Sequence, residues 1–143
     1  MARYVWGLLS ESVITDESSG KVSYINAVER LQPNELPVPL PNIFAAVTWR
    51  RESEGDVTSI RMRVMGPDRN QINVSEEREL KFDDSVWWRT RFQLFGIEVE
   101  TAGTHEFIVE QLVGDEWEAE ASIPLDILSP PRPEGDSEAE IDQ

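Results

Sequence analysis

The side chains that most often carry out catalysis are scarce in this sequence. His105 is the only histidine, and cysteine is absent. A histidine acts as a general base only where a second catalytic group is held beside it. His105 alternates with Phe107 and Val109, which favours a half-buried position in a strand, and no G-x-S-x-G sequence supports a serine triad. We therefore predict no catalytic residues and a protein that is not an enzyme, with an enzyme of unrecognised type as the least favoured alternative.

Carboxylates are the other chemically capable groups, because calcium prefers oxygen ligands. Adjacent acids fall in three expected loops: Asp16 with Glu17, Asp83 with Asp84, and Asp115 with Glu116. None of these pairs has the D-x-D-x-D spacing of a calcium loop, and the residue counts exclude zinc sites built from cysteine and histidine. We predict no metal site and no cofactor.

One set of residues has the composition of a partner-binding surface. Alternation along residues 86–94 turns Trp87, Arg89 and Arg91 outward, and alternation along residues 57–66 does the same for Arg61 and Arg63. Tryptophan and arginine are enriched in the hot spots of protein interfaces. These five residues are the predicted partner-binding site. The plainer interpretation is that the arginines pair with glutamates on neighbouring strands, with Trp87 lying over their aliphatic stems.

The elements that position these residues are expected to be strands. Short apolar alternations with a period of two, separated by turn residues, run through the chain, and no segment has a helical period. The clearest is "EWEAEASIPLDI", residues 116–127, which places on one face Trp117, Ala119, Ala121, Ile123 and Leu125. The side chains expected to be buried include Trp88, Phe92, Phe107 and Ile123.

The number and length of these strands predict one domain with two packed sheets. A single sheet of that size would leave an apolar face in water. We predict an all-β fold over residues 1–128: a β-sandwich, immunoglobulin-like or C2-like, with about eight mostly antiparallel strands and no significant helix. Residues 129–143, with three prolines and five acids, are predicted to form a disordered tail.

A proline-rich stretch interrupts the first half of the sequence. "LQPNELPVPLPNIF", residues 31–44, has prolines at positions 33, 37, 39 and 41. Ligands of SH3-type domains need prolines three residues apart, which this stretch lacks. Because proline has no amide donor, we interpret the stretch as a stiff connector between the sheets that does not pair with a neighbouring strand.

The charge of the chain constrains its partners. The formal net charge is −15, which disfavours nucleic acid because a phosphate backbone would be repelled. The distribution is uneven, since residues 50–91 hold nine of the thirteen bases while residues 98–120 hold eight acids and no base. No apolar run approaches the roughly 20 residues that cross a bilayer, and the start has no signal-peptide pattern. We expect a cytoplasmic protein that does not bind membranes.

Two classes of function remain after these exclusions. The favoured one is a non-catalytic protein-interaction or accessory module whose partner is another protein. The alternative is a small-ligand or carbohydrate-binding sandwich. A saccharide binder should expose several aromatic side chains on one face, whereas the alternation of the sequence exposes only Trp87.

Several segments resemble a known family. They are "WGLLSESVITDESSGKVSYINAVERL" at residues 6–31, "LPNIFAAVTWR" at 40–50, "GPD" at 66–68 and "AGTHEFIVE" at 102–110. In these segments the chain is similar to a family of small bacterial proteins that carry a domain of unknown function. The likeness covers most of residues 4–125 and leaves out the acidic tail. It implies an all-β domain from bacteria or their phages, and it brings no catalytic residues.

Overall fold

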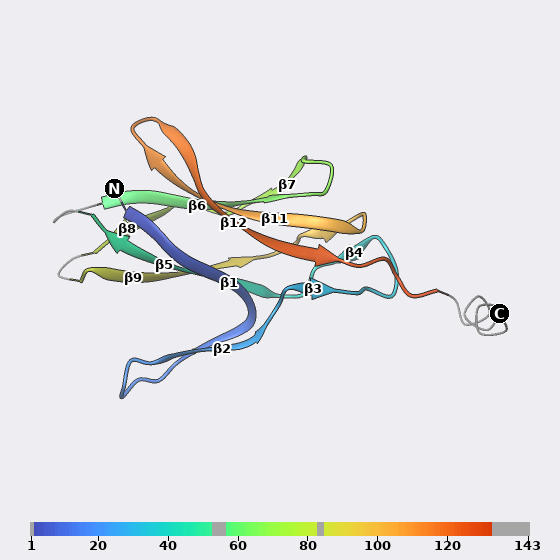
Figure 1. Cartoon of the computed structure of the whole chain (residues 1–143), viewed down its shortest axis with the longest axis horizontal. Helices are drawn as coiled ribbons and strands as arrows, with labels where there is room; N and C mark the ends of the chain where they lie inside the picture. The colour runs from blue at the N-terminus through green and yellow to red at the C-terminus, as the bar shows by residue number, and fades with distance from the viewer. Residues whose placement is uncertain (1, 53–56, 83–84, 133–143) are drawn as a thin grey trace.

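The fold is a sandwich of two β-sheets (Figure 1). The structure, a computed structural model, describes residues 2–52, 57–82 and 85–132. Within these ranges it has twelve strands and no helix, so none of the described segments is a helix able to cross a membrane. The expected all-β sandwich is confirmed. The strand count exceeds eight because two expected strands are each divided and two further two-residue strands, Val38–Pro39 in the connector and Glu98–Val99, pair with each other.

Each of the two large sheets has one continuous hydrogen-bonded order. Sheet A runs β2 (Val22–Ala27), β1 (Ala2–Thr15), β5 (Ile43–Arg51) and β9 (Trp87–Leu94). Sheet B runs β3 (Arg30–Leu31), β12 (Glu116–Ile127), β11 (Gly103–Val113), β6 (Val57–Met65) and β7 (Gln71–Val74), and β8 (Arg78–Lys81) also pairs with β6. A third ladder joins β4 (Val38–Pro39) to β10 (Glu98–Val99).

The core lies between the facing surfaces of sheets A and B. Alternate residues of each strand point into it, because successive side chains of a strand lie on opposite faces of the sheet. Trp49 and Phe92 enter from sheet A, and they meet Phe107 and Ile123 from sheet B. The expected burial of Phe92, Phe107 and Ile123 is confirmed.

Trp88 corrects the sequence-based expectation of burial. Its side chain is 39% exposed, although it lies on the inner side of β9 opposite Trp49. β9 is the last strand of sheet A, and Trp88 is only its second residue. The side chain therefore lies at a corner of the sandwich, where an inward direction does not guarantee cover from the other sheet.

A β-bulge corrects the expected faces of β12. The register between β11 and β12 shifts after Val109, so that Val109 faces Ala121 while the next residue, Glu110, faces Ala119. Two residues of β12 therefore lie opposite one residue of β11. The extra residue reverses the side-chain alternation of β12 on the N-terminal side of the bulge. Ile123 and Ala121 keep the inner face, but Trp117 is turned to the outer face of sheet B. The simple period of two at residues 116–125 therefore misassigned Trp117.

The proline connector pairs more than expected. Residues 30–31 form a two-residue parallel ladder with the end of β12, and Val38 and Pro39 pair with Val99 and Glu98. The expectation that this stretch avoids pairing is wrong at these two places, because proline lacks only the amide donor and its neighbours keep theirs: Val38–Pro39 pair although they lie within the proline run. The chain crosses from sheet A to the edge of sheet B and back, as expected of a connector.

β1 is shared between two partner strands. Residues 2–10 pair with β5, whereas residues 10–15 pair with β2. The end of β1 and β2 together form a two-stranded arm, which lies on the side of sheet A away from sheet B (Figure 1). This arm covers one end of the outer face of sheet A.

The beginning of the expected tail is held against the connector. The amide of Leu128 donates to the carbonyl of Leu31 at 2.8 Å, and Gln32 Nε2 donates to the carbonyl of Ser129 at 3.0 Å. The residues from 128 to 132 have no regular structure. The rest of the predicted tail lies outside the described residues, as do Asp83 and Asp84.

Candidate functional site

The five residues of the predicted site lie on two opposite surfaces. Trp87, Arg89 and Arg91 belong to β9 in sheet A, and Arg61 and Arg63 belong to β6 in sheet B. All five point away from the core, but the outer faces of the two sheets look in opposite directions, with about 10 Å of core between the sheets. The structure therefore does not bring them into one patch.

On sheet B the arginines are engaged by a buried carboxylate. Glu110 is only 3% exposed and lies between them. Arg61 Nε donates to Glu110 Oε1 at 2.8 Å, and Arg63 Nε lies 3.0 Å from the same oxygen. The guanidinium of Arg61 also lies over the ring of Trp117, 4.2 Å from its centroid. This arrangement matches the plainer interpretation for sheet B, with Trp117 rather than Trp87 covering the arginine.

On sheet A the outward side chains of β1, β5 and β9 form a grid. Residues that face one another across an antiparallel ladder share a face of the sheet. From the end under the arm to the open end, the rows are Leu8–Ala46–Arg91, Trp6–Thr48–Arg89 and Arg3–Arg50–Trp87. The small side chains stand in the middle of the first two rows. Because larger side chains flank Ala46 and Thr48 in these two rows, the surface of all nine residues is called the trough below.

The floor of the trough is buried although it lies on an outer surface. Ala46 is covered as fully as a core residue, and Thr48 is only 7% exposed, because larger side chains stand on both sides of them. Within the described ranges of the chain, the Thr48 hydroxyl has no hydrogen-bond partner. A buried hydroxyl without a partner is unfavourable, so this atom is the clearest local indication that the surface is incomplete by itself.

The arm encloses one end of the trough. Val13, Val22 and Tyr24 of the arm, together with Arg89 and Arg91, line a pocket of about 180 Å³ whose floor includes Ala46. The edge of Tyr24 packs against Trp6, with 5.4 Å between the ring centroids. The pocket therefore combines apolar walls with two guanidinium groups.

The trough is cationic in an acidic protein. Its four arginines are Arg3, Arg50, Arg89 and Arg91, all exposed. In the part of the chain that the structure describes, none of the four forms an ion pair with a carboxylate. The guanidinium of Arg50 lies over the exposed ring of Trp87, 5.4 Å from its centroid. This cation–π contact holds Arg50 beside the ring but does not neutralise its charge.

A protein-family model covers most of the chain. The model of a family of unknown function, DUF6941, matches residues 6–127. The chain belongs to this family. No curated protein matches the sequence. The match confirms the resemblance to a domain of unknown function, and it covers the whole trough except Arg3.

Other chemical groups of the DUF6941 domain do not assemble into a site. His105 is buried in β11, and its Nδ1 lies 3.1 Å from the carbonyl oxygen of Gly103, which is the structural role that its alternation favoured. Among the described residues no three potential metal ligands come together. Because Asp83 and Asp84 are outside that set, the absence of a metal stays a prediction, as does the absence of catalysis.

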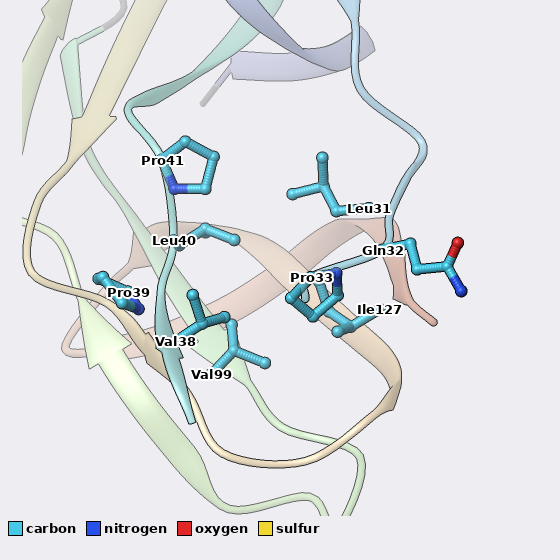
Figure 2. Close-up of a pocket in the computed structure, with 9 residues that line it drawn as sticks. All are labelled: Leu31, Gln32, Pro33, Val38, Pro39, Leu40, Pro41, Val99 and Ile127. Atoms are coloured by element: carbon cyan, nitrogen blue, oxygen red, sulfur yellow. The ribbon is translucent and has the colours of Figure 1, made fainter. Parts of the chain in front are cut away.

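A second hollow of the DUF6941 domain lies beneath the proline connector (Figure 2). It has a volume of about 220 Å³ and no charged side chain in its lining. Leu31, Val38 and Ile127 point toward its interior from three different segments (Figure 2). Nothing else in its surroundings indicates an occupant, so the trough is the better candidate.

Sequence reasoning found one side of the trough and missed the rest. Trp87, Arg89 and Arg91 were identified from alternation along β9. Arg50 and Thr48 alternate in the same way along β5, but their position beside β9 depends on strand pairing across about 40 residues. Trp6 was hidden by a bulge in β1 between Tyr4 and Trp6, which shifts the register with β5.

Proposed function

We propose that this domain is a non-catalytic protein-interaction module of a bacterial or phage cytoplasmic system, and that it binds its partner through the trough. The observation that carries the proposal is the set of exposed arginines beside Trp87 that have no carboxylate partner among the described residues, on a protein with a net charge of −15. Elsewhere on the molecule a similar pair of arginines is neutralised by a buried glutamate.

The composition of the trough supports an interface. Tryptophan and arginine contribute disproportionately to binding energy when a partner removes them from water. Trp87 is 51% exposed, so a partner would bury a large additional apolar surface there. The arginines would set the orientation and the rate of association.

A carbohydrate-binding module is the second candidate, and one observation favours it. Trp6 and Trp87 point outward from sheet A, and Tyr24 of the arm packs against Trp6, which is more than the single aromatic that the sequence indicated. Against it, the pocket under the arm has only about 180 Å³, below the roughly 300 Å³ at which small-molecule sites begin. A neutral sugar would also leave the guanidinium groups of the trough without a counter-charge.

Photo-crosslinking in the native host tests the proposal. A photoreactive phenylalanine analogue replaces Trp87 in one variant and Phe95 in a control variant. Phe95 is 65% exposed and lies outside the trough, so the control presents an equally accessible probe on another surface. We expect discrete protein adducts from position 87 that are absent from position 95. The same adducts from both positions, or none from position 87, would overturn the proposal.

The carbohydrate alternative has its own measurement. Saturable binding of a neutral oligosaccharide on a glycan array, lost in Trp87→Ala and kept in Phe95→Ala, would replace the protein-interaction proposal with the second candidate.

A further inference from the structure

We propose that the trough binds an extended acidic segment of the partner, with alternate carboxylates held by Arg89 and Arg91 and one of them also bound by the Thr48 hydroxyl. The inference rests on the proposed function and names the chemistry of the partner. It is carried by three features of the trough: its width, the spacing of its cations and its unpartnered hydroxyl.

The width of the trough favours an extended segment. Its two walls are the outward side chains of β1 and β9, which flank β5. Neighbouring strands lie about 4.8 Å apart, so the walls are about 9.6 Å apart. A helix with its side chains is about 10–12 Å wide, and a broad flat surface is blocked by the arm at one end. A single extended chain is the narrowest partner that can lie between these two walls.

The spacing of the cations matches the repeat of such a segment. Trp87, Arg89 and Arg91 are successive outward residues of β9, separated by two positions each. Two residues of a strand span about 7 Å, and alternate side chains of any extended peptide have the same repeat. A segment with an apolar residue and two acids at alternate positions would therefore meet Trp87, Arg89 and Arg91 in register.

The positive charges of Arg89 and Arg91 favour acidic residues at the peptide positions that face them. Arg89 and Arg91 lack carboxylate partners among the described residues, although the protein has 28 acidic residues. A guanidinium presents several N–H donors in a fixed plane and binds a carboxylate through two of them. Both arginines also line the pocket under the arm, so a bound carboxylate would be partly shielded from solvent.

The Thr48 hydroxyl supplies an independent observation. It is a buried donor with no partner, and it belongs to the same row as Arg89. The oxygen is covered in the unbound protein, so a carboxylate held by Arg89 would accept its proton, and satisfy the hydroxyl, once the flanking side chains move aside. Substituting Thr48 by valine keeps the shape of the side chain and removes only this donor, so it separates binding from packing.

Synthetic peptides test the inference on the whole chain. The probe is Leu-Ser-Glu-Ser-Glu-Ser-Leu with blocked ends, whose symmetry presents the same pattern in both directions. Its matched twin has glutamine in place of both glutamates. Binding is followed by the NMR shifts of the indole N–H groups at low and at physiological salt. The double variant Arg89→Gln/Arg91→Gln is compared with Arg30→Gln/Arg69→Gln, which removes two exposed cations outside the trough.

The expected result is saturable binding of the glutamate peptide with shifts at Trp6 and Trp87. Binding should weaken about ten-fold or more with the glutamine twin and with Arg89→Gln/Arg91→Gln, because charged hydrogen bonds are lost. The control pair should change affinity by less than about two-fold, and added salt should weaken binding. Thr48→Val should weaken it several-fold without lowering the melting temperature.

Three results would overturn the inference. They are equal binding of the two peptides, an equal effect of the two double variants, and tighter binding of a single-stranded oligonucleotide with the same number of charges, which would make the partner a nucleic acid. Adducts from position 87 together with a failed peptide experiment would leave the proposed function standing without this ligand. Peptide binding without protein adducts from position 87 would contradict the proposed function instead.

Discussion

The two outer faces of the sandwich use the same residue types in opposite ways. On sheet B, Arg61 and Arg63 close on the buried Glu110, and Trp117 lies over Arg61. On sheet A, Arg89 and Arg91 stand beside an exposed Trp87, and Arg89 shares its row with the Thr48 hydroxyl, which has no partner among the described residues. The first cluster is neutralised within the molecule by Glu110, although Arg63 Nε makes no hydrogen bond there among the described residues, and it stabilises the sheet. The second is unsatisfied, and it is the surface from which binding energy remains available.

The comparison shows why arginine and tryptophan do not by themselves indicate a binding site. An arginine paired with a buried carboxylate has already replaced its water with a protein partner, and a second protein gains little from it. An arginine without such a partner still offers its donors. The decisive quantity is therefore what each cation already contacts, and this differs between the two sheets.

The largest expected effect is on stability and comes from sheet B. Glu110→Gln leaves two guanidinium groups beside each other without a counter-charge. We expect a loss of about 3 kcal/mol in the free energy of unfolding, the lower end of the range for breaking a buried pair, because Arg61 and Arg63 keep some contact with solvent. Urea denaturation followed by tryptophan fluorescence measures it.

The exposed pair of Lys81 and Glu79 provides the control for this variant. Its Nζ–Oε1 distance is 3.2 Å, and both side chains are more than half exposed. Glu79→Gln should change stability by less than about 1 kcal/mol. If both variants had the same small effect, Glu110 would not be the centre of a structural cluster, and the contrast between the faces would fail.

Trp117 on sheet B should contribute more to the stability of the fold than Trp87 on sheet A. Trp117→Ala should cost about 1–2 kcal/mol, because it removes half-buried apolar area and the contact with Arg61. Trp87→Ala should change stability by less than about 0.5 kcal/mol, since its side chain is largely solvated. Thermal unfolding of the two variants checks the order. The reverse order would mean that the trough, not the cluster on sheet B, holds the fold.

The same substitution, threonine to valine, can be made at two positions to test whether the Thr48 hydroxyl lacks a partner. Thr48 and Thr58 are equally buried, but among the described residues only the Thr58 hydroxyl has acceptors, the Gln111 Oε1 atom at 3.3 Å and the Leu112 carbonyl oxygen at 3.4 Å. We expect Thr48→Val to raise the free energy of unfolding by about 1 kcal/mol and Thr58→Val to lower it by a similar amount. A loss of stability in both variants would show that Thr48 is satisfied in solution and would remove it from the proposed site.

The smallest effect concerns the arm over the trough. The pKa of Asp16 lies below its usual value, because the Ser18 hydroxyl at 2.8 Å and the amides of Ser18 and Ser19 donate to its carboxylate. A depressed pKa favours the folded turn above the pKa of the unfolded chain, and this contribution is lost as the pH falls through the folded pKa.

An NMR titration measures this shift at the turn. The Ser18 amide signal should titrate with a midpoint below the usual aspartate pKa of about 3.9. The variant Ser18→Ala should move the midpoint of Asp16 upward. An unchanged midpoint would mean that the turn at the tip of the arm is not held as described, and sheet A would then lack an ordered cover at that end.

The sequence predicted the class of fold and much of the core, because both follow from local alternation. Phe92 and Phe107 are buried as their period of two requires, and Arg89 and Arg91 are exposed for the same reason. Trp88 and Trp117 were misassigned where the alternation meets a strand end or a bulge. Neither feature leaves a signal in the spacing of apolar residues.

The sequence by itself determined that this protein is an all-β sandwich with outward arginines on two strands. Only the tertiary structure decided which of those arginines are neutralised. Glu110 lies 49 residues from Arg61 along the chain, and Thr48 lies 41 residues from Arg89, so neither neighbour can be inferred from local spacing. Strand register sets both pairs: it places a carboxylate beside the arginines of sheet B and a lone hydroxyl beside those of sheet A.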